Sequence, residues 1–114
     1  LIKNNHIAAA GGVTAALAAV RGQPLPAEIE VRTLDELDEA LAGGATRLLL
    51  DNLTPAEARE WIARIAGRAS VELSGGITLE SVRAYAEAGA GFVSSGAITH
   101  SARAMDIHFR LSLT

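Results

Sequence analysis

Four short apolar runs recur at nearly equal spacing along the chain, and this repeat constrains the fold more than any other feature of the sequence. The runs are AEIEV (27–31), RLLLD (47–51), SVELS (70–74) and GFVSS (91–95). Short apolar or β-branched runs of this kind are typical of buried strands in parallel sheets. Each run also carries a polar residue at or near its end, so polar groups are predicted to recur along one rim of the sheet.

Helical signals fill the intervals between these runs. The stretches from Thr33 to Glu36 and from Thr54 to Glu57 both have the capping-box pattern, in which a threonine and a glutamate side chain bond the first amides of a helix. Glycines follow the expected helix ends and favour termination there. Four helices are predicted in this way: one capped by Thr14 and running to about Arg21, one from Leu34 to Gly43, one from Pro55 to about Ala66, and one from about Leu79 to Ala88.

Strands that alternate with helices at a period of a little over twenty residues indicate βα units on a parallel sheet. Four or five such units make about half of an eight-unit barrel, which usually has roughly 250 residues. An open, doubly wound sheet is the alternative fold. The last segment, MDIHFRLSLT, alternates apolar and polar residues, which predicts a strand with one solvated face that leaves the barrel.

Composition excludes several classes of protein. The 114 residues are 49% hydrophobic with a formal net charge of −3, which indicates a single globular domain and argues against a general nucleic-acid or membrane-surface binder. The absence of cysteine excludes disulfides, thiolate metal sites and cysteine nucleophiles. No apolar stretch is long enough to span a bilayer and no signal peptide is evident, so we expect a cytoplasmic protein. Because the chain opens on LIK as if within a strand, we also expect a piece of a longer protein.

Two small-residue turns predict a phosphate site. Glycines let the backbone approach an anion closely, and a following helix offers free N–H groups with a partial positive charge. The first turn is Ser74, Gly75 and Gly76; the second is Ser95, Gly96 and Ala97, on the next unit. Adjacent turns of this kind form the phosphate site of many barrels. His100 follows at the predicted start of a short helix, where it could bond the same phosphate. The alternatives are that the glycines only make tight turns and that His100 is a surface or capping residue.

Charged side chains complete the predicted rim. Glu30 and Asp51 come from consecutive strands, and two carboxylates beside a phosphate site suit ribose hydroxyls and a Mg²⁺ ion that bridges a pyrophosphate. Lys3, at the end of the first apolar stretch, is a suitable point charge for a phosphate or carboxylate. Glu28 faces the same side as Glu30 by strand alternation, so one of the two could pair with a basic residue. Asp51 as a plain turn residue and Lys3 as a solvated lysine stay open.

These stretches, in this order, resemble the quinolinate phosphoribosyltransferase family, the carboxylating nicotinate-nucleotide pyrophosphorylases of NAD synthesis. The similarity is carried by LIKNNHI, EIEVRTLDELDEAL, LLLDN, VELSGGITLESVRAYAEAGAGFVSSGAITHS and AMDI, which cover nearly the whole chain. The resemblance implies an N-terminal α/β sandwich followed by an incomplete α/β barrel. Residues 1–105 would form the second half of that barrel, and residues 106–114 a strand that joins the sandwich domain, which is absent here.

The resemblance also implies roles for the rim residues. Lys3 matches a family lysine near the pyridine dicarboxylate and the pyrophosphate, while Glu30 and Asp51 match the acidic pair that holds the ribose and the metal-bound diphosphate. The residues of the two small turns match the loops that grip the ribose 5-phosphate, and His100 matches a histidine beside them. One departure is Asn4, where the family usually has an acid.

The implied reaction joins quinolinate to phosphoribosyl pyrophosphate, releases pyrophosphate and CO₂, and forms nicotinate mononucleotide with Mg²⁺ as cofactor. The family's basic clamp for quinolinate matches no residue of this chain and comes partly from a second subunit of a homodimer. We therefore expect the fragment alone to be inactive. Two rival hypotheses are a paralogue of the same fold, of the molybdenum-utilisation type, and a non-catalytic phosphate-binding module.

Overall fold

The computed structural model describes residues 1–101 and 104–113 and contains a four-stranded parallel sheet in the order β1-β2-β3-β4. The strands are β1 (Ile29–Val31), β2 (Arg47–Asp51), β3 (Ser70–Ser74) and β4 (Phe92–Val93). The predicted α/β class and parallel sheet are therefore confirmed. The second and third predicted runs match their strands, whereas the first and fourth strands are shorter than predicted.

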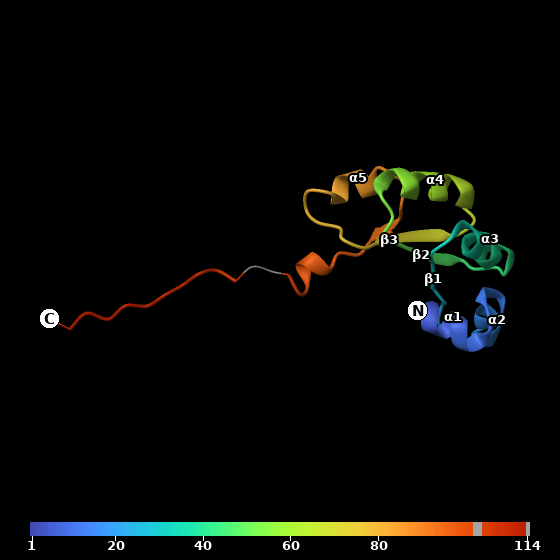
Figure 1. The fold of residues 1–114 in the computed structure, drawn as a ribbon, viewed down its shortest axis with the longest axis horizontal. Helices are drawn as coiled ribbons and strands as arrows, with labels where there is room; N and C mark the ends of the chain where they lie inside the picture. The colour runs from blue at the N-terminus through green and yellow to red at the C-terminus, as the bar shows by residue number, and fades with distance from the viewer. Residues whose placement is uncertain (102–103, 114) are drawn as a thin grey trace.

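Five α-helices and one 3₁₀ turn accompany the sheet in the described residues. They are α1 (Asn4–Ala10), α2 (Val13–Ala19), α3 (Leu34–Ala42), α4 (Pro55–Ile65), α5 (Val82–Ala86) and the 3₁₀ turn η1 (Gly96–Ile98). Helices α4 and α5 lie over one face of the sheet, and α1 and α2 lie at the β1 end (Figure 1). The core lies between the helices and the strand residues that point toward them, which include Ile29, Leu48, Leu50 and Leu73, each no more than 1% exposed.

The predicted capping box is complete at α4, whereas only one of its two hydrogen bonds forms at α3. Thr54 and Glu57 form the complete reciprocal box at α4. At α3 the Thr33 hydroxyl accepts the Glu36 amide at 3.1 Å as expected. The Glu36 carboxylate, however, accepts the amide of Arg32 at 2.7 Å rather than that of Thr33, because it also forms an ion pair with the Arg32 guanidinium at 3.2 Å.

Three helix predictions differ from the structure. Thr14 lies inside α2 rather than at its cap, because its amide and hydroxyl bond the Glu39 carboxylate of α3, at 2.9 and 2.7 Å. Helix α5 begins only at Val82, since the Ser81 hydroxyl accepts the Thr78 amide at 3.0 Å and holds a turn before it. Helix α1 was not predicted; the His6 Nδ1 atom accepts the Lys3 amide at 3.0 Å and closes its first turn.

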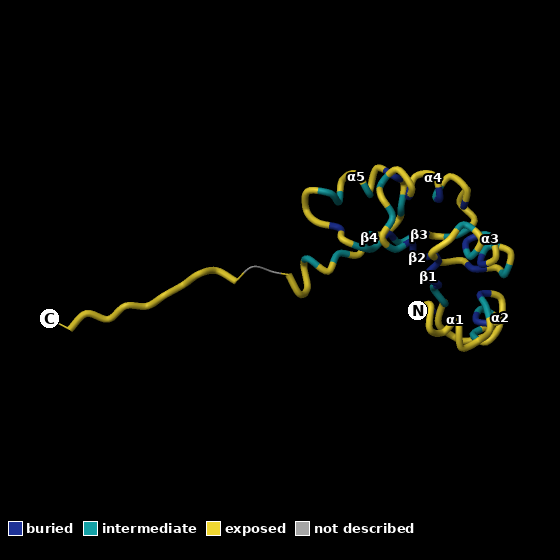
Figure 2. The backbone as a smooth tube through the Cα atoms, in the orientation of Figure 1, coloured by how far each residue is buried: buried dark blue, intermediate teal, exposed yellow. Residues whose placement is uncertain are grey.

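Residues 104–113 carry no helix or strand and are exposed (Figure 2). The C-terminal strand predicted for residues 106–114 is thus absent from residues 106–113, while Thr114 lies outside the described residues. A strand needs a neighbour for its backbone hydrogen bonds, and the sheet expected to supply one is not in this chain. Its pairing with a separate domain stays a prediction.

Candidate functional site

The carboxyl ends of the strands bring the predicted rim residues to one edge of the sheet. Asp51 pairs with Ser74 in the β2–β3 register, and Leu73 pairs with Val93 in the β3–β4 register, so the loops after these strands leave the sheet at the same level. Glu30 pairs with Leu49 and therefore lies two residues, or about 7 Å, below the level of Asp51. Alternation along the strands points Glu30, Asp51 and Ser74 to the face opposite the helices.

Lys3 joins this edge because residues 1–3 run alongside β1. Ile2 forms a parallel bridge with Ile29, its amide donates to the Glu28 carbonyl at 2.8 Å, and its carbonyl accepts the Glu30 amide at 2.9 Å. This pairing places the Lys3 ammonium 3.5 Å from the Glu30 carboxylate. Glu30 is only 9% exposed, so the ion pair explains how an apolar strand tolerates a carboxylate. The sequence left open which of two glutamates would pair with a base, and Glu30 does.

Asp51 lies between this ion pair and the phosphate loops, because β2 separates β1 from β3. Its carboxylate accepts the Asn52 side-chain amide at 2.6 Å, and the Asn52 backbone amide donates to the Ser74 carbonyl at 3.0 Å. Asn52 adopts φ +58°, a left-handed conformation that ends β2 sharply. Asp51 therefore ends β2, and its half-buried carboxylate accepts a hydrogen bond on the face of the sheet opposite the helices, which we call the open face.

The two small-residue turns form the walls of one cavity of about 490 Å³. Its lining residues are Ser74, Gly75, Gly76, Ile77, Thr78, Gly96, Ala97, His100 and Ser101. The structure thus brings together every predicted phosphate-loop residue except Ser95. A cavity lined by backbone amides, hydroxyls and an imidazole, without a carboxylate, suits an anion.

Gly75 is required by close packing as well as by conformation. It has φ +96°, and a Cβ atom added to it would lie 2.5 Å from the Asn52 amide nitrogen. The loop after β3 therefore lies directly on the turn after β2. This contact ties the phosphate cavity to the Asp51 carboxylate on the neighbouring strand.

His100 lines the cavity but follows η1 rather than beginning a helix. Its amide donates to the Gly96 carbonyl at 3.0 Å, and its ring packs so tightly on Gly96 that a Cβ atom there would lie 3.0 Å from Cε1. The Nδ1 atom lies 3.0 Å from the Ser101 hydroxyl. The glycine at position 96 is thus explained by the imidazole that covers it.

Ser95 differs from its predicted place. Its hydroxyl donates to the Ile77 carbonyl, and its side chain lies with Val82 and Val93 on the helix side of the loop. Ser95 therefore fastens the second phosphate loop to the first instead of facing the cavity.

The hydrogen bond between Ser94, at the start of the second small-residue turn, and Glu72 was not predicted from the sequence. The Ser94 hydroxyl donates to the Glu72 carboxylate on the open face, while the Ser94 amide donates to the Leu73 carbonyl at 2.9 Å. Glu72 lies two residues before Ser74 and so shares its face, which strand alternation alone could have indicated. Burial, and secondarily the charge of Glu72, raise the pKa of Glu28 lower on the same face. Acidic groups therefore extend below the phosphate cavity.

The described residues contain no cluster of three groups able to hold a metal ion by themselves. Glu30 and Asp51 offer hard carboxylate oxygens on adjacent strands, which is the donor set that Mg²⁺ accepts when substrate phosphates supply its remaining ligands. The site therefore fits a magnesium ion that arrives with a diphosphate. In the part of the chain that the structure describes, no helix has the length and apolar character needed to cross a membrane.

Comparison with known proteins gives a family match over nearly the whole chain. The profile described as "Quinolinate phosphoribosyl transferase, C-terminal domain" matches residues 1–110. The probable carboxylating nicotinate-nucleotide pyrophosphorylase of Bacillus subtilis is 37% identical over 117 residues, covering 100% of this chain and 40% of that protein. The chloroplastic carboxylating nicotinate-nucleotide pyrophosphorylase of Arabidopsis thaliana is 38% identical over 132 residues, covering 97% and 38%.

A solved structure agrees with these relatives. NadC from Streptococcus pyogenes has a TM-score of 0.82 and 37% identity, covering 92% of this chain and 38% of its own. The chain therefore spans about two fifths of the length of the proteins it matches. The predicted half-barrel is consistent with this coverage.

Proposed function

The chain belongs to the quinolinate phosphoribosyl transferase family, as a match to its C-terminal domain, and from this premise we propose that it supplies the phosphoribosyl-binding part of a carboxylating nicotinate-nucleotide pyrophosphorylase. The observation that carries the proposal is the shared cavity of the two small-residue loops, placed beside Asp51 and the Lys3–Glu30 pair. The relatives named above are carboxylating pyrophosphorylases, which favours this enzyme over a molybdenum-utilisation paralogue or a phosphate-binding module.

The 5-phosphate of phosphoribosyl pyrophosphate would occupy the cavity. The backbone N–H groups of the two loops would be the donors there, and His100 covers one side. The Thr78 and Ser101 hydroxyls, which also line the cavity, already contact Ser81 and His100. Because β1 and β3 are about 10 Å apart, a ribose held at β3 reaches toward the carboxylates on β2 and β1. Asp51 and Glu30 would accept hydrogen bonds from the ribose hydroxyls, because ionised carboxylates act only as acceptors and hydroxyl groups can donate.

The reaction forms a bond between the quinolinate nitrogen and the anomeric carbon of the ribose and breaks the bond from that carbon to pyrophosphate. The quinolinate 2-carboxylate then leaves as CO₂, and a proton replaces it on the ring. The nearby carboxylates stabilise the positive charge that develops at the anomeric carbon, and Lys3 attracts the departing pyrophosphate. When bound, Mg²⁺ neutralises charge on that leaving group.

The quinolinate clamp, the homodimer and the cytoplasmic location all belong to the parent protein in this proposal. The described part of the chain has one lysine on the rim, which is too little basic character to hold a dicarboxylate and a diphosphate together. We therefore propose that the rest of the parent and a second subunit provide the clamp, and that the 114-residue chain alone forms no nicotinate mononucleotide.

A chimera tests the proposed function. The two fifths of the B. subtilis relative that match this chain are replaced by the chain, and formation of nicotinate mononucleotide from quinolinate and phosphoribosyl pyrophosphate is followed by chromatography. We expect turnover within tenfold of the parent enzyme. A chimera that melts cooperatively but forms no product contradicts the proposal.

Two substitutions in the chimera test the site. Asp51→Asn and Glu30→Gln keep the shapes of the side chains and remove their charges, and each should lower kcat/KM by about 100-fold. Glu60→Gln, at an exposed position of α4, is the matched control and should leave kcat/KM unchanged. Unchanged kcat/KM in both site variants would mean that these carboxylates do not take part.

A further inference from the structure

The second phosphate loop, which contains Ser95, Gly96 and Ala97, follows the shortest of the four strands. Strand β4 has two residues, Phe92 and Val93, and it pairs with β3 on one side. In the part of the chain that the structure describes, no strand pairs with its other side. A ladder of two residues gives the loop few backbone hydrogen bonds, so its position against the first loop depends on side-chain bonds.

Two serines fasten this loop, one on each face of the sheet. On the helix side the Ser95 hydroxyl donates to the carbonyl of Ile77, directly after the first loop. On the open face the Ser94 hydroxyl donates to the Glu72 carboxylate of β3. A hydroxyl group has a single proton, so the Ser94 hydroxyl has none left for a phosphate. Consistently, Ser94 is not among the described residues that line the phosphate cavity.

Glu72 lies where it can hold Ser94 without contacting a phosphate. It is absent from the described lining of the phosphate cavity. It lines a separate cavity of about 110 Å³, whose other lining residues are Glu28, Arg47, Ser70 and Phe92. The register places Glu72 level with Glu30, with Leu49 between them, so their Cα atoms lie about 10 Å apart. Within the described residues, Glu72 belongs to no group of three that could hold a metal ion.

We propose that Glu72 is a positioning residue for the phosphate site. By accepting the hydrogen bond from Ser94, its carboxylate holds the second phosphate loop against the first, so that the backbone N–H groups of both loops can bind one phosphate. A hydrogen bond to an ionised acceptor is about twice as strong as a neutral one, which is the advantage of a carboxylate here. The inference deepens the proposed function and rests on it for the identity of the substrate.

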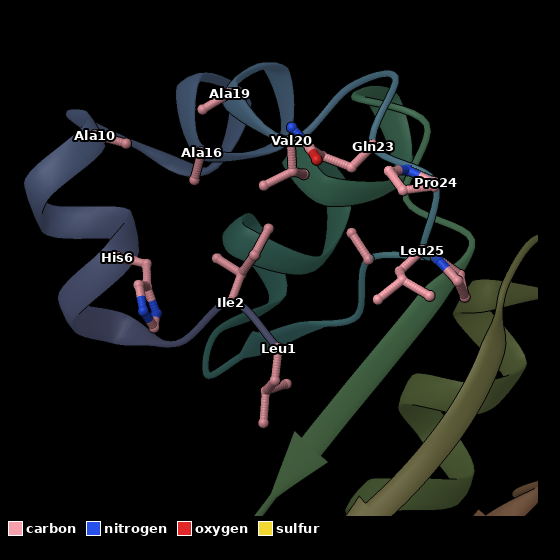
Figure 3. A pocket seen from close by; sticks show the side chains of 12 residues that line it. Leu1, Ile2, His6, Ala10, Ala16, Ala19, Val20, Gln23, Pro24 and Leu25 are labelled. Atoms are coloured by element: carbon pink, nitrogen blue, oxygen red, sulfur yellow. The ribbon is translucent and has the colours of Figure 1, made fainter.

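A second cavity, distant from both loops, does not compete for a sugar phosphate. It has a volume of about 530 Å³ and lies between α1, α2 and the loop after α2 (Figure 3). Alanine, leucine and proline side chains form much of its lining, and among the described lining residues there is no Lys or Arg. An anion has no cationic side chain to pair with there, so binding of a sugar phosphate reports on the loops after β3 and β4.

A double-mutant cycle in the chimera tests the inference. Glu72→Leu removes the acceptor, Ser94→Ala removes the donor, and isothermal titration calorimetry with ribose 5-phosphate gives the dissociation constant without need of turnover. Each single variant should weaken binding about tenfold, because a hydrogen bond to a charged group is lost. The double variant should also weaken binding about tenfold rather than about 100-fold, because both substitutions remove the same bond.

Matched variants separate the hydrogen bond from the charge. Glu72→Gln keeps an oxygen acceptor and loses the charge, so binding should stay within about threefold. Ser70→Ala removes a serine hydroxyl at the other end of β3, which donates to the Thr46 carbonyl at 3.2 Å, and should leave binding within about twofold. In turnover, Glu72→Leu should raise KM for phosphoribosyl pyrophosphate about tenfold, while kcat and KM for quinolinate stay within about twofold.

Three results would overturn the inference. The first is a loss of about 100-fold in the double variant, because the two side chains would then act independently. The second is a fall of about 100-fold in kcat/KM for Glu72→Gln, as expected for Asp51→Asn, since Glu72 would then be a catalytic carboxylate. The third is unchanged binding in Ser94→Ala, which tests the bond even where Glu72→Leu does not fold, because Ser94 is exposed.

The outcomes also separate this inference from the proposed function. Coupling between Glu72 and Ser94 in a chimera that forms no product upholds the inference and contradicts the proposed function. Product formation without coupling does the reverse. A folded chimera that does not bind ribose 5-phosphate overturns both, and a cooperative thermal transition verifies that each variant is folded.

Discussion

Replacement of Gly75 by alanine provides a direct test of how the strand ends are joined. Gly75 has φ +96°, and an added Cβ atom would lie 2.5 Å from both the amide nitrogen and the side-chain Oδ1 atom of Asn52 and 2.8 Å from its Cα. Two of these three atoms belong to the backbone, so a simple side-chain rotation does not relieve the overlap. Gly76 is the matched control: it has φ +62° and no atom within 4 Å of such a Cβ.

The expected cost follows from these distances. A left-handed conformation costs a non-glycine residue about 1–2 kcal/mol, and this applies to both positions. Forced overlap in a packed site adds about 1–3 kcal/mol, and this applies only to Gly75. Gly75→Ala should therefore lower the free energy of unfolding by about 2–5 kcal/mol, and Gly76→Ala by about 1–2 kcal/mol.

Urea unfolding of the 114-residue chain, followed by far-UV circular dichroism at pH 7, measures both variants. A lower midpoint with an unchanged slope would report lost stability rather than a change in the unfolded state. If Gly75→Ala is no less stable than Gly76→Ala, the turn after β2 does not press on the loop after β3. The link between Asp51 and the phosphate cavity would then be wrong.

Two further predictions concern hydrogen bonds that the structure shows. The Thr14 amide and hydroxyl hold the pKa of Glu39 below its ordinary value of 4.5, so this contribution to stability is present at neutral pH and is lost as the pH falls below about 4.5. The urea midpoint of Glu39→Gln should therefore change less between pH 6 and pH 3 than the midpoint of the unsubstituted chain. The same pH dependence in both proteins would refute this role of Glu39. Ser95→Ala removes the bond to the Ile77 carbonyl and should cost about 1 kcal/mol. In the chimera, Ser95→Ala should also raise KM for phosphoribosyl pyrophosphate more than KM for quinolinate, and equal increases would count against a role in positioning the phosphate loops.

Local sequence signals predicted the elements that depend on neighbouring residues. The complete Thr54–Glu57 box at α4 is an example, since all its partners lie within one turn. The β2 and β3 boundaries were also predicted, because short apolar runs bounded by turn residues leave few alternatives. The prediction that the two glycine turns meet at one site is confirmed by their common cavity, whereas the binding roles of their residues stay predictions.

Other features depended on contacts that no local pattern contains. Thr14 looked like a helix cap, but Glu39, 25 residues away, accepts both of its donors. Ser95 was predicted to face the phosphate site, but strand alternation turns its side chain toward the helices and the Ile77 carbonyl, and its role in binding stays a prediction. Helix α1 was missed because its first turn is closed by a histidine, which is not among the usual capping residues.

The amino-acid sequence by itself determined the alternation of strands and helices from β1 onward and the edge of the sheet where polar groups collect, because periodicity and turn chemistry are local properties. The tertiary structure alone decided which of those groups face one another. It paired Lys3 with Glu30, placed Gly75 against Asn52 and turned Ser95 away from the cavity. These outcomes depend on strand register, and a shift of one residue reverses the face of every side chain on a strand.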